Sequence, residues 1–165
     1  MGFKDKIVKA SKTLIDTLEP KEATPGELFE VTTYVSTTYF TDNVEKLISK
    51  MKIPVNNNYI MEKAEKSFKV YKYRSIQVPV NLEFEPKNEH DSNAIKVTVP
   101  VGLENIQLGY IKREENIQIG SYLKDKRVYN INATLFGGPI KVLSGNGPVD
   151  QSERYKVAIS MLIRK

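Results

Sequence analysis

The chain has 165 residues, a length that suits one domain with a short terminal addition. Hydrophobic residues make up 40% of the sequence and charged residues 27%, a balance that favours a folded protein over a disordered one. No apolar run approaches the roughly 20 residues that a membrane-spanning helix needs, and the charged N-terminal residues are unlike a signal peptide. We therefore expect a cytoplasmic protein that has no membrane partner.

Two residue counts exclude whole classes of chemistry. The sequence has no cysteine, which excludes disulfides, thiolate metal sites and a cysteine nucleophile. The single histidine, His90, argues against a Ser-His-Asp triad or a two-histidine zinc site, and we expect no metal and no cofactor. The 25 basic and 20 acidic residues give a net charge of +5, which favours polyanionic partners only mildly.

The N-terminal 27 residues are predicted to form an amphipathic helix and a linker. Apolar residues recur at helical spacing, with lysines between them, at Phe3, Ile7, Leu14 and Leu18. The helix should end before Pro20, because the residue that precedes a proline leaves the α region. We expect this helix to pack on the domain, and a helix on a membrane surface is the alternative.

A strand and two helices are predicted next. Residues 29–35 alternate between apolar and polar side chains, as a half-buried strand requires. Asp42, followed three residues later by Glu45, predicts a helix start in which the Asp42 carboxylate caps an N–H group. The buried face of this helix is predicted to hold Val44, Leu47, Ile48 and Met51, and that of a second short helix Ile60, Met61, Ala64 and Phe68.

From residue 76 onwards the sequence predicts mostly β-structure. Apolar residues alternate over residues 76–84, and Pro79 places that strand at an edge or a bulge because proline lacks a ladder donor. Further strands are predicted over 95–99, 108–111, 129–135, 140–142 and 155–163, with a helical segment around 114–123 and a polar turn over 144–152. This pattern predicts a mainly β protein with short helices (α+β), built as a small closed or nearly closed barrel.

The most informative stretch is LEFEPKNEHDSNAIKV, residues 82–97. A strand ends before Pro86, a polar loop follows, and a second strand begins after the loop. Asn88, Asp91 and Asn93 have side chains that bond nearby N–H groups, which is why such residues gather in tight loops. Taken by itself, this composition is explained by a well-formed turn between two strands.

The same stretch resembles the central motif of the HIRAN domain family. In that motif a strand ends in a charged residue and a proline, and a loop of the type N-x-aromatic-D-x-N-A-I leads into the next strand. The matching residues are Glu85, Pro86, Asn88, His90, Asp91, Asn93, Ala94 and Ile95. A second block is similar to the family's G-[YH]-[LI] strand and the basic residues after it: Leu108, Gly109, Tyr110 and Ile111, followed by Lys112, Arg113 and Glu114. The resemblance covers about residues 28–163, with residues 52–74 as an insertion relative to the shortest members.

The resemblance implies an OB-like small β-barrel in residues 28–165, after the N-terminal helix and linker of residues 1–27. HIRAN domains occur fused to DNA helicase-type ATPases and nucleases, and also alone in bacteria and phages, the type that this chain resembles. In fork-remodelling enzymes the domain captures a 3′ single-stranded DNA end. The expected ligand is therefore single-stranded or end-containing DNA in repair or replication, with RNA as an alternative. A helicase or a nuclease is the candidate protein partner, and the oligomeric state stays open.

Carried over by position, the resemblance implies a binding site. Asn88, His90 and Asp91 would line the floor of a pocket, and Lys112 with Arg113 would hold backbone phosphates. A carboxylate in such a pocket must accept a hydrogen bond from a neutral donor, and a free 3′-hydroxyl is such a donor whereas a 3′-phosphate is not. His90 stands where the motif often has tyrosine, and its imidazole offers less surface for stacking on a base.

Aromatic residues outside the loop are candidates for stacking on bases. Tyr39 and Phe40 follow the first strand, and base–aromatic stacking contributes about 1–3 kcal/mol per base. The alternative is that both are core aromatics that cap the barrel beside the helix. The FKVYKYR segment, residues 68–74, alternates basic and aromatic residues as a nucleic-acid track would, although an ordinary solvated strand face is the simpler interpretation.

Two other functions stay open on the sequence. A metal-dependent nuclease would use Glu83, Glu85, His90 and Asp91 as ligands for Mg²⁺ or Mn²⁺, but no further acidic cluster completes a two-metal site, and we expect no enzymatic activity. A protein-interaction module that binds a peptide in the barrel groove is the other alternative. Phosphate-driven binding weakens steeply as salt rises, which separates nucleic-acid binding from peptide binding.

Overall fold

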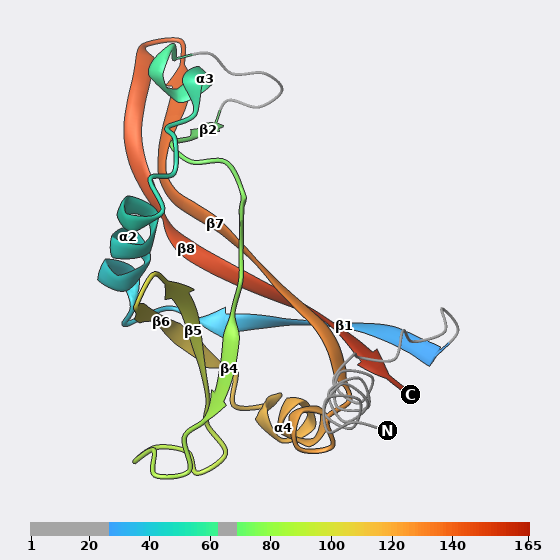
Figure 1. The fold of residues 1–165 in the computed structure, drawn as a ribbon. Coiled ribbons are helices and arrows are strands. Elements are labelled where there is room, and N and C mark those ends of the chain that lie inside the picture. The colour runs from blue at the N-terminus through green and yellow to red at the C-terminus, as the bar shows by residue number, and fades with distance from the viewer. Residues whose placement is uncertain (1–26, 63–68) are drawn as a thin grey trace, which may run out of the picture.

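The computed structural model describes residues 27–62 and 69–165 (Figure 1). Residues 1–26 of the predicted N-terminal helix and linker, which were expected over 1–27, lie outside the described residues, and so do Ala64 and Phe68. The elements that follow are β1 (Leu28–Ser36), α2 (Thr41–Lys50), α3 (Asn57–Ile60), β2 (Lys69–Tyr71), β3 (Ile76–Val78), β4 (Asn81–Phe84), β5 (Ile95–Val101), β6 (Glu104–Ile111), α4 (Asn116–Lys124), β7 (Val128–Ser144) and β8 (Gly147–Arg164). The predicted mainly β fold with short helices is confirmed.

All eight strands join one antiparallel sheet, in the order β2-β7-β8-β1-β6-β5-β4, with β3 also paired to β7. Only Pro79 and Val80 separate β3 from β4, so one bent segment pairs with β7 at one end and with β5 at the other. This segment closes the sheet into the expected OB-like barrel. Pro79 lies where the segment changes partner, a position that needs no ladder donor, as predicted.

The core fills the barrel, and α2 covers it. Alternation on β8 buries Tyr155, Val157, Ile159, Met161 and Ile163, as the sequence predicted. Helix α2 adds Val44, Leu47 and Ile48, and α4 adds Ile119. Burying one such aliphatic side chain contributes about 1.5–3 kcal/mol, so this core holds the strands that position the loops. None of the described helices has the length and apolar character that crossing a bilayer requires.

Strands β7 and β8 form a long hairpin that extends past the barrel as an arm, with β2 and α3 against it (Figure 1). The polar turn predicted over residues 144–152 is wrong, because Ser144 pairs with Gly147 and the following residues continue β8. The composition of this segment is turn-like, but ladder hydrogen bonds to β7 override it. The Gly137–Gly138 pair interrupts the register within β7 as a bulge rather than ending the strand.

Other local predictions also need correction. Helix α2 begins at Thr41 with Phe40 as its N-cap and no side-chain cap, so Asp42 is not the cap and lies in the first turn instead. A carboxylate in the first turn still interacts favourably with the helix dipole. Ile60 and Met61 are exposed rather than buried, because α3 has only four residues. Strand β5 continues through Pro100 to Val101 instead of stopping at the proline.

Candidate nucleic-acid interface

The loop between β4 and β5 is organised by the side chain of Asn88. The Asn88 Oδ1 atom accepts the N–H groups of His90 and Asp91 at 3.0 and 3.1 Å. At the base of the loop, the N–H of Glu85 donates to the carbonyl of Ala94 at 2.9 Å. The backbone turn predicted from the Asn and Asp residues is therefore present, with Asn88 at its centre.

Glu85 ties this loop to β6 and to the start of α2. Its Oε2 atom accepts hydrogen bonds from Asn88 Nδ2 and from the Tyr110 hydroxyl, each at 2.7 Å. These two donors, Asn88 first, lower the pKa of the Glu85 carboxyl. The Tyr110 ring in turn packs edge-on against Phe40, with 5.9 Å between ring centroids. Glu85 and Tyr110 thus link the loop to Phe40, a role that the sequence analysis did not assign to either residue.

Asp91 is oriented by helix α4. Its Oδ1 atom accepts the N–H of Asn93 at 2.9 Å, and its Oδ2 atom accepts the side-chain amide of Asn116 at 2.7 Å. Asn116 is buried at the start of α4, so the Asp91 carboxylate is held from both sides. A carboxylate offers about four acceptor positions. These two hydrogen bonds leave positions for a further donor at Asp91.

The loop and the residues after β6 enclose an open hollow of about 500 Å³, which we call the loop hollow. It is lined by Asn88, Glu89, His90, Asp91, Ser92, Asn93, Arg113 and Ile117. Four of the predicted site residues, Asn88, His90, Asp91 and Arg113, are therefore brought together. The carboxylates of Glu89 and Asp91 outnumber the single guanidinium of Arg113, so the loop hollow is not a basic site.

Lys112 lies in a different place from Arg113. Its ammonium group lies 5.6 Å from the centroid of the Tyr34 ring, and its side chain lines a second hollow between β1 and β8. Strand β6 ends at Ile111, and the chain turns directly afterwards, since the N–H of Glu115 donates to the Lys112 carbonyl at 2.9 Å. Lys112 and Arg113 were predicted to act together on phosphates, but the fold assigns them to two adjoining surfaces.

Tyr39 and Phe40 differ in their environments. The Tyr39 side chain is 92% exposed in the turn between β1 and α2, so the alternative that it caps the core is wrong. Phe40 is half-buried against Tyr110. Tyr39 therefore presents a free ring face, whereas Phe40 mainly supports β6.

The basic and aromatic segment around β2 belongs to the arm of the β7–β8 hairpin. Lys69 forms an ion pair with Glu153 at 3.0 Å, and the Tyr71 hydroxyl donates to the same carboxylate at 2.8 Å. The hydrogen bond to Glu153 raises the pKa of Lys69. The hydrogen bonds from Tyr71, the larger cause, and from Lys69 lower the pKa of Glu153. Figure 1 places β2 at the opposite end of the molecule from the β4–β5 loop. The ordinary strand face is thus the better interpretation.

The carboxylates considered as metal ligands are engaged with neighbouring side chains. Glu83 pairs with Lys96 at 3.2 Å and accepts the Thr98 hydroxyl at 3.2 Å, while Glu85 is held by Asn88 and Tyr110. Across residues 27–62 and 69–165, no three His, Asp or Glu side chains gather as a set that could hold a metal ion. The arrangement favours hydrogen bonding over metal binding at this loop.

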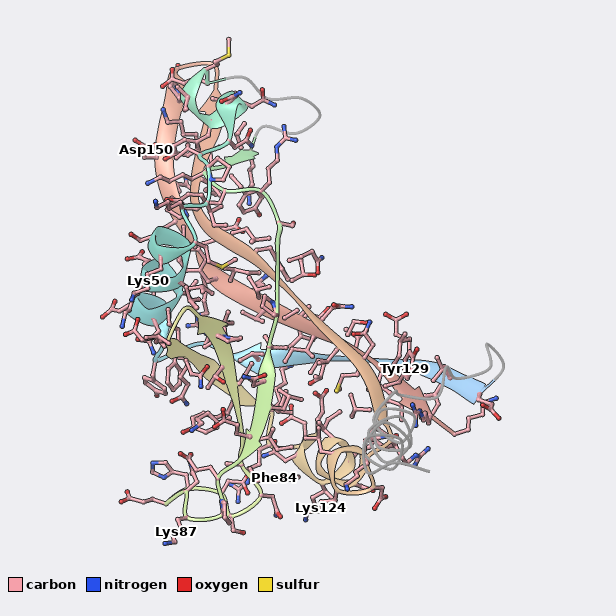
Figure 2. All side chains as sticks on the ribbon, viewed as in Figure 1. Lys50, Phe84, Lys87, Lys124, Tyr129 and Asp150 are labelled. Atoms are coloured by element: carbon pink, nitrogen blue, oxygen red, sulfur yellow. The ribbon has the colours of Figure 1, made fainter. Side chains whose placement is uncertain are left out.

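A smaller hollow of about 310 Å³ lies between the loop, β4 and α4. Figure 2 shows Phe84 and Lys124 beside one another there, and Lys87 at the tip of the loop. The Lys124 ammonium lies 5.3 Å from the Phe84 ring centroid. Phe84, the last of the alternating apolar residues predicted over 76–84, is 43% exposed and lines this hollow.

Comparison with known proteins identifies the family. The family model for the HIRAN domain matches residues 31–139. A crystal structure of the HIRAN domain of human HLTF is similar, with a TM-score of 0.39 and 16% sequence identity over 86% of this chain and 84% of that chain. No curated protein matches the sequence. HIRAN is known as a DNA-binding domain, and the match supports nucleic-acid binding as the broad function. This chain belongs to the HIRAN domain family.

Proposed function

We propose that this chain binds the 3′-hydroxyl end of single-stranded DNA in the loop hollow. The observation that supports the proposal is the convergence of Asn88, His90, Asp91 and Arg113 around one open hollow. A polynucleotide end needs a phosphate-binding cation, a group that recognises the terminal atoms and a surface for the last base. These residues supply all three.

Each residue has a distinct part in the proposal. Asp91, held by Asn116 and the Asn93 N–H, accepts the terminal hydroxyl at a free acceptor position. Arg113 neutralises the last phosphodiester, and the imidazole of His90 lies against the terminal base. Tyr39, exposed on the neighbouring turn, stacks on a base further along the strand.

The charge of the loop hollow supports a hydroxyl end over a phosphate end. Two carboxylates and one guanidinium line it. A terminal phosphate carries about −1.5 to −2 charges near neutral pH and would be repelled by these carboxylates. A hydroxyl is neutral and donates, so it fits the same surroundings.

We further propose that the chain acts by binding alone, in repair- or replication-type processing alongside a helicase or a nuclease. Glu83 and Glu85, two of the four ligands that a metal nuclease would use, already bind neighbouring side chains. Incubation of a labelled single strand with the protein and Mn²⁺ tests this point. The strand should stay intact, and cleavage would support the nuclease instead.

The binding test uses fluorescence anisotropy with oligothymidylates that carry an internal fluorophore. The wild-type protein should bind a strand with a 3′-hydroxyl more tightly than the same strand with a 3′-phosphate, and more tightly than a circular strand of the same length. Equal affinity for the three ligands would contradict the proposal. An RNA strand of matched length and end tests whether the sugar matters.

Variants connect the result to the loop hollow. Asp91→Asn should reduce the preference for the hydroxyl end, because a neutral amide no longer repels a terminal phosphate. Arg113→Gln should weaken binding of both strands. Lys87→Gln is the matched control, since Lys87 lies on the same loop, loses the same charge and is absent from the lining of the loop hollow (Figure 2).

A further inference from the structure

A second open hollow, of about 490 Å³, lies between β1 and β8, and we call it the β1–β8 hollow. Its polar lining includes Lys112, Arg154 and Lys156, together with Tyr34, Thr38 and Glu114. Three cationic side chains thus face one carboxylate. The balance is opposite to that of the loop hollow, in which carboxylates predominate.

Strand pairing explains why these cations lie together. On β8, Tyr155 and Val157 point into the core, so Arg154 and Lys156 point outward. The hydroxyl of Thr37 donates to the carbonyl of Tyr155 at 2.8 Å, which holds the end of β1 beside this part of β8. The outward side chains of β8 therefore lie next to the segment that leads to Tyr39.

Among the described residues, the three cations of the β1–β8 hollow are not held in ion pairs. In the part of the chain that the structure describes, none of Lys112, Arg154 and Lys156 joins an ion pair, whereas five other lysines do. Two of them contact neutral groups: Arg154 Nη1 donates to the Thr38 hydroxyl at 3.3 Å, and Lys112 lies over the Tyr34 ring. The charge of Lys156 interacts with the Glu153 carboxylate without an ion pair. A cation cluster of this kind, with an aromatic ring 46% exposed beside it, suits a polyanion with stacking groups.

The two hollows adjoin one another. Lys112 lines the β1–β8 hollow and the next residue, Arg113, lines the loop hollow. Thr38 lines the β1–β8 hollow and the exposed Tyr39 follows it directly. A strand whose end lies in the loop hollow can therefore continue past Tyr39 toward Arg154 and Lys156.

We propose that the β1–β8 hollow is a second binding site, which holds the backbone phosphates of the nucleotides preceding the 3′ end. This inference rests on the proposed function of the loop hollow. The two sites divide the ligand by charge, since the hollow with excess carboxylate takes the neutral hydroxyl and the hollow with excess cations takes the phosphates. Each phosphate neutralised releases counterions, which makes this part of the binding strongly salt-dependent.

The experiment measures affinity for 3′-hydroxyl oligothymidylates of two to twelve nucleotides. Wild-type affinity should rise with length until the second site is filled. The double variant Arg154→Gln/Lys156→Gln should bind the shortest strand as the wild type does, and the longest strand about fivefold or more weakly. Its plot of log affinity against log salt for the longest strand should be shallower by about 1.4, at about 0.7 per phosphate contact on a single strand.

The double variant Lys46→Gln/Lys50→Gln is the matched control. It removes the same two charges from α2, where both lysines pair with Glu104, and it should follow the wild type at every length. If the wild type shows no preference for a hydroxyl end, the proposed function of the loop hollow fails. If the wild type shows that preference but the Arg154/Lys156 variant loses nothing, or loses equally at all lengths, the β1–β8 site is overturned. Circular dichroism checks that each variant is folded.

Discussion

At the residue scale, two neighbouring aromatic residues serve different purposes. Tyr39 is almost wholly exposed, whereas Phe40 packs edge-on against Tyr110. Adjacent aromatics in one turn look equivalent in the sequence. Only the contact between the Phe40 and Tyr110 rings distinguishes Phe40, which stabilises the fold, from Tyr39, which is free to contact a ligand.

This difference predicts different effects of two alanine variants on stability. Tyr39→Ala should change the free energy of unfolding by less than about 0.5 kcal/mol, since it removes no packing. It should weaken single-strand binding by about 1–3 kcal/mol, or roughly 5- to 150-fold, through lost stacking. Phe40→Ala, in contrast, should lower the free energy of unfolding by about 1–2 kcal/mol, because it removes a half-buried ring. Chemical denaturation and anisotropy titrations measure the two effects, and equal stability losses would contradict the assignment.

Glu85 gives a pH-dependent prediction. Hydrogen bonds from Asn88 and Tyr110 lower the pKa of Glu85 below its ordinary value of 4.5. Because the pKa is lower in the folded state than in the unfolded state, the stabilisation is fully present above pH 4.5 and is lost as the pH falls through the folded-state pKa. The wild type should therefore lose stability over this acidic window, and Glu85→Gln should lose less.

Denaturant unfolding at a series of pH values measures the difference. Glu89→Gln is the control, because Glu89 is an exposed carboxylate on the same loop. It should retain the acid sensitivity of the wild type. A Glu85→Gln variant with an unchanged pH profile would show that the hydrogen bonds from Asn88 and Tyr110 contribute nothing measurable to folding.

At the scale of elements, the closest approach of β1 to β6 depends on Gly109. Its φ is 145°, and a Cβ atom at this position would lie 2.1 Å from the Ser36 carbonyl oxygen. No side-chain movement can relieve a clash with backbone. The next residue, Tyr110, pairs with Ser36, and its hydroxyl donates to Glu85 at 2.7 Å.

We expect Gly109→Ala to lower the free energy of unfolding by more than about 2 kcal/mol, because it adds a steric clash to backbone strain. Gly102→Ala is the matched control. Gly102 has a φ of 62° but no atom within 4 Å of a built Cβ, so only the strain of about 1–2 kcal/mol applies. Thermal or denaturant unfolding compares the two variants. Equal losses in the free energy of unfolding would mean that the close contact between β1 and β6 does not exclude a side chain at residue 109.

The strands also show which elements could be predicted from the sequence. Alternation located β1, β5 and β8 because burial on one face repeats every second residue. The residues of the 144–152 segment have turn propensity, but β7 pairs with them and extends the hairpin. Pairing with a partner strand outweighed local propensity there, and a local sequence pattern holds no information about which strand pairs with it.

At the scale of the whole molecule, the cations are distributed over two adjoining hollows. Arg113 lines one, and Lys112, Arg154 and Lys156 line the other. A net charge of +5 on 165 residues is modest, so binding of a polyanion relies on where the cations lie rather than on their number.

This arrangement predicts the salt dependence of single-strand binding. If the four cations each contact a phosphate, the plot of log affinity against log salt should have a slope of about −2.8, at about 0.7 per contact. Titrations at four or more salt concentrations measure it. A slope near zero would favour the alternative of a peptide-binding module, in which counterion release has no part.

The sequence by itself determined the mainly β character, the strand faces and the Asn- and Asp-rich loop, because these depend on side-chain periodicity and local backbone bonding. It also carried the motif by which the loop resembles the HIRAN domain family. Tertiary structure alone decided that β3 and β4 close the barrel, that Lys112 and Arg113 separate, and that Arg154 meets Thr38. Arg154 and Thr38 are 116 residues apart in the chain, and strand pairing over such a distance is selected by the packing of the whole core.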